Sequence, residues 1–369
     1  MPSAWLAFEA GKITALGTGQ PPPTPSLVDA HASYLAPGFV DIHLHGANGA
    51  DFLDATPDAF RTISEFHTSG GTTAIAPTAA TATYQKLEQV LQTAAIAKTP
   101  GRLLPAHLEG PHLSKNKAGA QDHSLFSNPT AKEIAWVEER ASQIGTITVA
   151  PELPGALDFI RACARAGVLM SAGHSEAMDE EMQAGVSFGL RKATHLYNAM
   201  GTAKKIGLFR HAGLLEFVLA TPDLYGELVA DGFHALPTLM KLAYEAKGPD
   251  RLILVTDSLA GAGLAEGARF QLGNYRCKVG PGYGVLEDES ALAGSLARMI
   301  DLVRNMTTVA DVPLYEAVRM ASLNPAQALG WADRIGSLEP GKFADLVLFD
   351  DQFRVNCTIV SGQTVYRNQ

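Results

Sequence analysis

The stretch Val40-Asp41-Ile42-His43-Leu44-His45 combines an apolar, strand-forming run with two histidines at alternate positions. Because side chains alternate across a strand, His43 and His45 are expected to point to the same side. Two imidazoles on one side of a strand end can bind one metal ion. In a chain with 11 histidines such a pair also arises by chance, so its interpretation depends on the segments that follow.

Seven further strand-like runs follow the first one, separated by segments with helical patterns. The eight candidate strands are Phe39–His43, Thr72–Pro77, Leu103–Leu108, Thr146–Ala150, Val168–Ala172, Ala193–Leu196, Glu227–Ala230 and Leu252–Thr256. Between strands, Thr56-Pro57 predicts a helix N-cap with proline at the first helical position. Thr130 with Glu133 predicts a capping box. Regular alternation of strands and helices favours a parallel sheet covered by helices.

Eight such units in a chain of this length indicate a (β/α)8 TIM barrel. A doubly wound sheet is the alternative, but neither Gly-x-Gly-x-x-Gly nor a Walker loop follows the first strand. We expect the barrel over 37–331, with a β-hairpin insertion at 266–290. Residues 1–36 and 332–369 have hairpin-like patterns and are expected to pair as one small β-sandwich domain. The strand-like segment Arg269–Leu286 could extend that domain.

Composition and charge exclude several classes of protein. The chain has 369 residues, 46% of them hydrophobic, and a net charge of -9, which disfavours nucleic acid and anionic membranes as partners. Its three cysteines, Cys163, Cys277 and Cys357, form no Cys-x-x-Cys motif, so we expect reduced thiols in the cytoplasm. No run of residues has the length and apolarity of a membrane span.

Further polar residues follow other predicted strands. Glu109 follows Leu103–Leu108, His174 and His195 end or follow two later strands, and Asp257 follows the last one. Each histidine alone could be a core residue, and Glu109 alone could form a salt bridge. In a barrel, however, these strand ends converge on one mouth. Imidazole and carboxylate ligands without thiolate suit Zn²⁺, Fe²⁺ or Mn²⁺.

A carboxylate beside such an ion, as expected for Asp257, can accept a proton and return it. A bound divalent ion can also activate water and polarise a carbonyl group. The pattern therefore predicts metal-assisted hydrolysis of an amide or a related C–N bond.

The chain resembles the amidohydrolase superfamily and, over nearly its full length, the N-acetylglucosamine-6-phosphate deacetylases within it. Several motifs carry this resemblance. They are Pro37-Gly38-Phe39-Val40-Asp41, His107-Leu108-Glu109-Gly110-Pro111, Gly173-His174-Ser175, Thr194-His195-Leu196-Tyr197-Asn198-Ala199-Met200, Ala230-Asp231-Gly232-Phe233-His234, Val255-Thr256-Asp257-Ser258, Leu292-Ala293-Gly294-Ser295 and Asn324-Pro325-Ala326.

The resemblance implies a role for each motif residue. The ligands implied for a principal divalent ion are Glu109, His174 and His195. Those implied for a second ion are His43 and His45, with Glu109 bridging. Asp257 would act as the general base and acid. The residues implied for contacts to a sugar phosphate are Asn198, the backbone of Ala199, Arg210 and His234.

Two departures from the family pattern affect these assignments. Many members carry a histidine where this chain has Gln121, so Gln121 would contact the substrate as a neutral donor. The run Phe209-Arg210-His211-Ala212-Gly213 is altered and lies in a longer loop. Arg210 is the best match for phosphate, since a guanidinium donates two parallel hydrogen bonds, but Lys204 and Lys205 compete for that role.

The activity implied is removal of acetate from N-acetyl-D-glucosamine 6-phosphate, in amino-sugar catabolism or cell-wall recycling, by a homodimer with one or two divalent ions. Two alternatives stay open: a galactosamine-type amino-sugar phosphate, or a cyclic amide. The fourth predicted strand, Thr146–Ala150, contains no lysine, which argues against the members that use a carboxylated lysine.

Overall fold

The protein was analysed as a computed structural model, which describes residues 4–24, 27, 29–30 and 34–368. Its centre is a parallel sheet in which eight strands follow one another in chain order, as the sequence predicts. These strands are β4 (Phe39–Leu44), β7 (Thr72–Ala79), β9 (Ala106–Glu109), β10 (Ile144–Val149), β11 (Leu169–Ala172), β12 (Leu190–Ala193), β15 (Tyr225–Leu228) and β16 (Leu252–Leu254). A short strand, β8 (Arg102–Leu103), pairs with β7.

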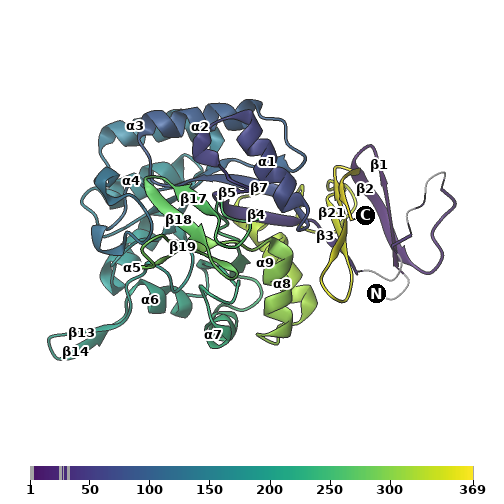
Figure 1. The fold of residues 1–369 in the computed structure, drawn as a ribbon. Coiled ribbons are helices and arrows are strands. Elements are labelled where there is room, and N and C mark those ends of the chain that lie inside the picture. Colours follow the sequence, from purple (N-terminus) through teal and green to yellow (C-terminus); the bar gives the residue numbers. More distant parts are fainter. Residues whose placement is uncertain (1–3, 25–26, 28, 31–33, 369) are drawn as a thin grey trace.

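A few specific hydrogen bonds close the sheet between its first strand, β4, and its last, β16. The backbone N–H of Asp257 donates to the carbonyl oxygen of His43 at 2.9 Å, and that of His45 donates to Ser258 at 2.7 Å. One step deeper, the buried carboxylate of Asp41 accepts the hydroxyl of Thr256 at 2.6 Å. The closed sheet with helices around it is the predicted TIM barrel (Figure 1).

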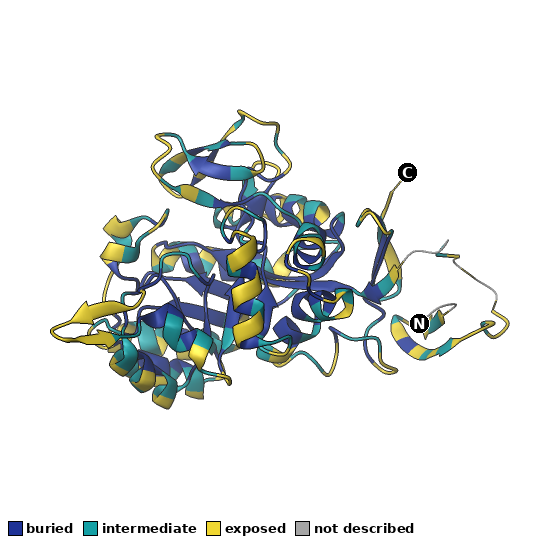
Figure 2. Cartoon of the chain, turned by 90° about the horizontal axis from the view of Figure 1, so that it is seen from below, coloured by how far each residue is buried: buried dark blue, intermediate teal, exposed yellow. Residues whose placement is uncertain are grey.

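Helices surround the barrel and are capped where the sequence predicts. Thr56 and Thr130 each accept a backbone N–H at a helix start, and Glu133 completes the capping box. The helices are α1 (Pro57–Thr68), α2 (Tyr84–Ile96), α3 (Ala131–Arg140), α4 (Ala156–Arg165), α5 (Asp179–Phe188), α6 (Leu214–Ala220), α7 (Pro237–Lys247), α8 (Met299–Thr308), α9 (Leu314–Ala321) and α10 (Leu323–Ala328). Barrel strands are buried, and exposed residues lie on outer faces and loops (Figure 2).

Three strands differ from the sequence prediction, and one of them, β15 (Tyr225–Leu228), begins and ends two residues before the predicted Glu227–Ala230. The third candidate strand is interrupted before Pro105, because proline cannot donate a ladder hydrogen bond. The sixth strand is β12, Leu190–Ala193, rather than Ala193–Leu196. The charged Arg191 and Lys192 suggest a loop, but Lys192 is fully buried against Glu227. Tertiary pairing therefore overrides the local pattern at this strand.

Both ends of the chain contribute to the small β-domain, as predicted (Figure 1). Four strands form one sheet in the order β23-β22-β21-β3. They are β3 (Tyr34–Pro37), β21 (Leu346–Phe349), β22 (Val355–Val360) and β23 (Gln363–Arg367). A hairpin of β1 (Ala4–Glu9) and β2 (Lys12–Thr18) joins them, because Ile13 is hydrogen-bonded to Lys342 and packs with Leu346 and Ile359. The boundaries proposed at 36/37 and 331/332 stay predictions.

The insertion after β16 is larger than the expected hairpin and does not extend the terminal β-domain. It is a sheet of four antiparallel strands, β17 (Arg269–Leu272), β18 (Tyr275–Val279), β19 (Tyr283–Leu286) and β20 (Leu292–Ser295). Its apolar residues Phe270 and Leu272 bury against Leu259. The backbone of Ser295 is also hydrogen-bonded to Asp257, at 3.0 Å. These contacts attach the insertion to the barrel mouth.

A second excursion, the hairpin of β13 (Lys204–Ile206) and β14 (Phe209–His211), projects away from the barrel between β12 and α6. It lies at the edge of the molecule in Figure 1. Two short strands, β5 (Gly46–Ala47) and β6 (Ala50–Asp51), complete the fold. Among the residues placed by the structure, no helix is long and apolar enough to cross a membrane.

Candidate metal centre and active site

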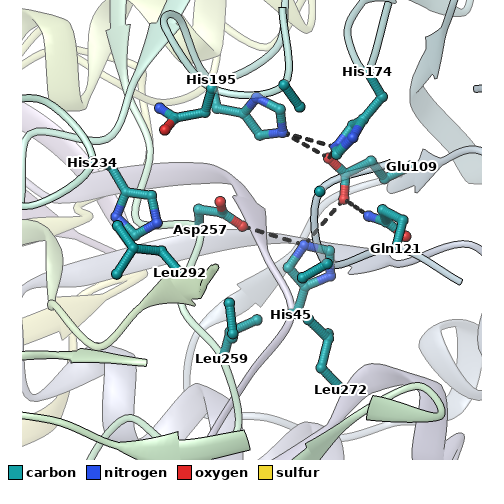
Figure 3. A pocket seen from close by; sticks show the side chains of 15 residues that line it. His45, Glu109, Gln121, His174, His195, His234, Asp257, Leu259, Leu272 and Leu292 are labelled. Carbon is teal, nitrogen blue, oxygen red and sulfur yellow. Dashed lines mark hydrogen bonds and ion pairs between the residues drawn. The ribbon is translucent and has the colours of Figure 1, made fainter. Parts of the chain in front are cut away.

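A cavity of about 300 Å³ opens at the carboxyl ends of the barrel strands, beneath the inserted sheet. Figure 3 shows the side chains that line it. The lining residues include candidates from the sequence analysis, namely His45, Glu109, Gln121, His174, His195, Asn198, Ala199, His234 and Asp257. His43 is fully buried and lies immediately behind this wall.

Glu109, His174 and His195 form a first trio. The Nε2 atoms of His174 and His195 each lie 3.1 Å from Oε1 of Glu109 and 3.1 Å from one another. Ligands ~2.0–2.1 Å from a tetrahedral ion lie ~3.3 Å apart. The three donor atoms therefore have the spacing of a ligand set around one ion.

His43, His45 and Asp257 form a second trio. The Nε2 atoms of His43 and His45 lie 3.5 and 3.3 Å from Oδ1 of Asp257. Glu109 connects the two trios, since its Oε2 lies 3.3 Å from Nε2 of His45 while its Oε1 faces the first trio. This is the arrangement expected if one carboxylate bridges two ions.

The backbone turns sharply at three of these residues. His174, His195 and Asp257 each follow a barrel strand and have positive φ values of 47°, 30° and 48°. A non-glycine residue rarely adopts this conformation, which costs about 1–3 kcal/mol. Strained backbone after three strands of one barrel is typical of a functional site, because other contacts must hold it there.

Charge in the site is balanced between carboxylates and imidazoles. Burial alone would raise the pKa of Glu109, but the charge of His43 and hydrogen bonds from the other imidazoles hold that pKa well below its usual value. Burial would likewise lower the pKa of His45, but the hydrogen bonds that its ring donates to Asp257 and Glu109 raise it to about 9. The ionised carboxylates thus favour a cation between them.

The donor set fits a divalent ion. It contains nitrogen and oxygen ligands without sulfur, which suits Zn²⁺, Fe²⁺ or Mn²⁺. The Nε2 of His43 is buried and has no hydrogen-bond partner within the described part of the chain. Such an atom is costly to bury unless it binds something, and it faces the carboxylates of both trios.

Further polar groups face the cavity, with His234 on the side of Asp257 and Gln121 beside Glu109 (Figure 3). Nδ1 of His234 lies 2.7 Å from Oδ2 of Asp231, so the ring presents its other nitrogen to the cavity. Burial alone would lower the pKa of His234, but Asp231 outweighs burial and raises it. Gln121 accepts the backbone N–H of Thr81 at 2.8 Å and donates to Glu109 at 2.5 Å, which fixes its amide orientation.

Comparison with known proteins identifies the family. Residues 34–365 match the amidohydrolase family. The N-acetylglucosamine-6-phosphate deacetylase of Vibrio furnissii is 33% identical over 338 residues, covering 90% of this chain and 83% of that protein. The chain belongs to the amidohydrolase family, among the N-acetylglucosamine-6-phosphate deacetylases.

Solved structures of this family share the whole fold. That of the deacetylase from Pasteurella multocida has a TM-score of 0.93 and 29% identity, covering 100% of this chain and 96% of the other. A mutant of the Mycobacterium smegmatis deacetylase, in complex with N-acetyl-D-glucosamine-6-phosphate, has a TM-score of 0.90 and 31% identity. The similarity covers 98% of this chain and 94% of the Mycobacterium smegmatis chain. The barrel and terminal β-domain are therefore features that this amidohydrolase shares with those proteins.

One motif residue lies apart from the site. Arg210 is on β14 of the projecting hairpin and is exposed, as are Lys204 and Lys205. Among the residues that the structure describes, no lysine or arginine lines the cavity. Within one copy of this amidohydrolase, the basic residue expected at the phosphate is thus missing from the cavity.

Sequence reasoning missed two features of the site. Asp231 is part of the quoted motif and lies three residues before His234, a spacing that could have indicated its contact. Leu259, Leu272 and Leu292 form an apolar wall, two of them from the inserted sheet. No local signal predicts that wall, because it depends on where the insertion packs.

Proposed function

We propose that this protein removes acetate from N-acetyl-D-glucosamine 6-phosphate, giving D-glucosamine 6-phosphate. The observation that carries the proposal is the cavity in which Glu109 connects the two trios, which face Asn198 and His234. The family supports the same activity, because its matching members bear this name. The reaction breaks the amide C–N bond by addition of water.

We propose that Glu109, His174 and His195 hold a principal divalent ion, and that His43 and His45 hold a second one with Glu109 bridging. When bound, the metal would polarise the amide carbonyl and lower the pKa of a water molecule. Zn²⁺, Fe²⁺ or Mn²⁺ would suit these ligands. Elemental analysis of protein purified without added metal should find one or two equivalents per chain.

Asp257 is proposed as the general base and acid. Burial alone would raise its pKa, but the charge of His43 outweighs burial and lowers it. The carboxylate is therefore ionised and can take a proton from the attacking water. It then returns that proton to the departing amine nitrogen, which leaves as the neutral or protonated amino sugar.

The sugar and phosphate are proposed to lie on the other side of the cavity. Asn198, the backbone N–H of Ala199 and Gln121 are donors at the cavity wall. His234 has a raised pKa because of Asp231, so it favours an anionic group. The side chains of Leu259 and Leu272 provide an apolar surface against which the acetyl methyl group would pack.

The function is tested by acetate release from a set of matched sugars. N-acetyl-D-glucosamine 6-phosphate should be hydrolysed at least about 10-fold more efficiently than the unphosphorylated sugar, given the ~1.5–3 kcal/mol of a charged hydrogen bond. Equal rates on both would contradict phosphate recognition. The galactosamine epimer and a hydantoin serve as comparison substrates, and turnover of the hydantoin alone would favour the cyclic-amide alternative.

We also propose a cytoplasmic homodimer in which Arg210 reaches the phosphate in a second copy. Arg210 lies on a hairpin that exposes Leu208 (84%) and Phe209 (70%), and apolar residues this exposed favour contact with another protein surface. The overall charge of the chain is negative, so the anionic substrate needs a local cation. The three cysteines are free and buried, as in a reducing compartment.

Arg210→Met is expected to lower kcat/KM for the phosphorylated sugar about 10- to 100-fold, the value of a lost charged hydrogen bond. Mixing subunits distinguishes the source of the arginine. If Arg210 acts on the partner's site, a mixed dimer of Arg210→Met and Asp257→Asn subunits has one intact site and regains activity. Two impaired sites in that mixture would show that Arg210 acts within its own subunit, and an Arg210→Met homodimer with unchanged kcat/KM would show that Arg210 has no role.

A further inference from the structure

A buried ion pair lies beneath the two trios, and the proposed mechanism uses neither of its members. Lys192 on β12 and Glu227 on β15 are both 0% exposed, and the ammonium of Lys192 contacts Oε1 of Glu227. Neither residue lines the cavity. A buried ion pair contributes little net stability, because desolvation offsets its attraction and apolar residues often replace it without loss. Its presence here suggests a role other than stability.

The second oxygen of Glu227 contacts both trios. Its Oε2 lies 3.0 Å from Nδ1 of His43, which belongs to one trio. The same oxygen accepts the backbone N–H of His195, a member of the other trio, at 3.3 Å. The contact to His43 involves its ring, whereas the contact to His195 involves only its backbone. Glu227 can therefore control the protonation site of the first residue but not that of the second.

A carboxylate can only accept at this distance, so Nδ1 of His43 carries the proton that is shared with Glu227. The lone pair of the other ring nitrogen, Nε2, is then the one available to an ion, whereas without an ion the carboxylates of Glu109 and Asp257 favour a proton there. Nε2 faces the carboxylates of Glu109 and Asp257 at 3.6 and 3.5 Å and is otherwise unpartnered among the described residues. This is the tautomer that a metal ligand needs, and such outer partners commonly set metal affinity.

We propose that Glu227, with its charge balanced by Lys192, is a positioning residue for the second ion, the one held by His43 and His45. By holding the proton on Nδ1 of His43, it orients the ring so that the lone pair of Nε2 points at that ion when the ion is bound. The positive charge of Lys192 offsets the free-energy cost of burying the carboxylate of Glu227. The inference rests on the proposed function only in assuming a two-ion centre, and it makes no use of the deacetylation step.

The test measures metal binding directly. Metal-free protein is titrated with Co²⁺, and each bound equivalent is followed by its absorption spectrum and by calorimetry. The variant Lys192→Met with Glu227→Leu removes both charges and keeps an apolar filling, so it is expected to fold. It should bind the first ion as the wild type does. Its affinity for the second ion should fall about 10- to 100-fold.

Two further variants separate positioning from a general loss of structure. Glu227→Gln keeps an oxygen that can accept from Nδ1, so its loss of affinity should be smaller. Asp345→Asn is the matched control, because Asp345 is also a buried carboxylate, paired with Arg102 at 3.2 Å in the terminal β-domain. It should lower the melting temperature without changing either metal affinity.

Two results would overturn the inference. One is binding of a single Co²⁺ by the wild type, and the other is unchanged affinity for both ions in the double variant. The proposed function fails on a different result. Wild-type protein that binds two ions as expected but releases no acetate would refute the deacetylase proposal and leave the role of Glu227 standing.

Discussion

Asp257→Asn is expected to lower the rate of acetate release about 10²- to 10⁴-fold, the usual contribution of a general acid–base group. The amide of asparagine cannot accept a proton from water or return one to the amine. The ion held by Glu109, His174 and His195 should remain, because Asp257 is not one of that trio. The measurements are kcat on N-acetyl-D-glucosamine 6-phosphate and metal content by elemental analysis.

Asp250→Asn is a suitable control, since Asp250 precedes the same strand, β16, at its opposite end. Asp250 is exposed and pairs with Arg319 at 2.8 Å. Its substitution should change neither kcat nor metal content. Wild-type turnover in the Asp257 variant would contradict the proposed acid–base role, whereas loss of the second ion would mean that Asp257 acts as a ligand beside His43 and His45.

Glu109→Gln should have the second large effect, the loss of both ions and nearly all activity. Glu109 is the only described residue whose carboxylate oxygens contact imidazoles of both trios. An amide lacks the negative charge that balances two cations. Since a bound ion contributes several kcal/mol to the reaction, kcat/KM should fall by more than about 10³-fold. Elemental analysis should find well below one equivalent of metal.

Glu88→Gln provides the corresponding control on the outside of the barrel. Glu88 lies on α2 and pairs with Arg140, away from the cavity. That variant should keep its metal and activity, with at most a small change in melting temperature, because exposed ion pairs contribute little. A Glu109 variant that retained two ions would contradict the bridging role.

Local sequence patterns predicted most of the barrel correctly. Strand-forming runs at regular spacing indicated all eight strands, and Thr56 and Thr130 marked helix starts that the structure confirms. The candidate ligands were also recognisable, since each follows a strand and parallel strand ends meet at one mouth. These features depend on neighbouring residues, which is why the sequence alone could predict them.

The errors occur where contacts join distant segments. The strand Leu190–Ala193 was misplaced because Lys192 is polar, and only its partner on β15 explains its burial. The insertion was expected as a hairpin within the barrel that could extend the terminal β-domain, but it is a sheet of four strands whose apolar face packs on Leu259. The position of Arg210 depends on a hairpin that makes few contacts within the chain, so its motif could not locate it.

The sequence by itself therefore determined the alternation of strands and helices, the metal-binding residue types and the family. Periodicity, capping and strand-end histidines are local properties, and they need no knowledge of packing. Only the tertiary structure decided which oxygen of Glu109 faces which trio, that Glu227 and Lys192 lie beneath His43, and that Arg210 lies outside the cavity. These relations join residues far apart in the chain. Only the closed barrel brings Lys192 on β12 against Glu227 on β15, and Glu227 within 3.0 Å of His43 on β4.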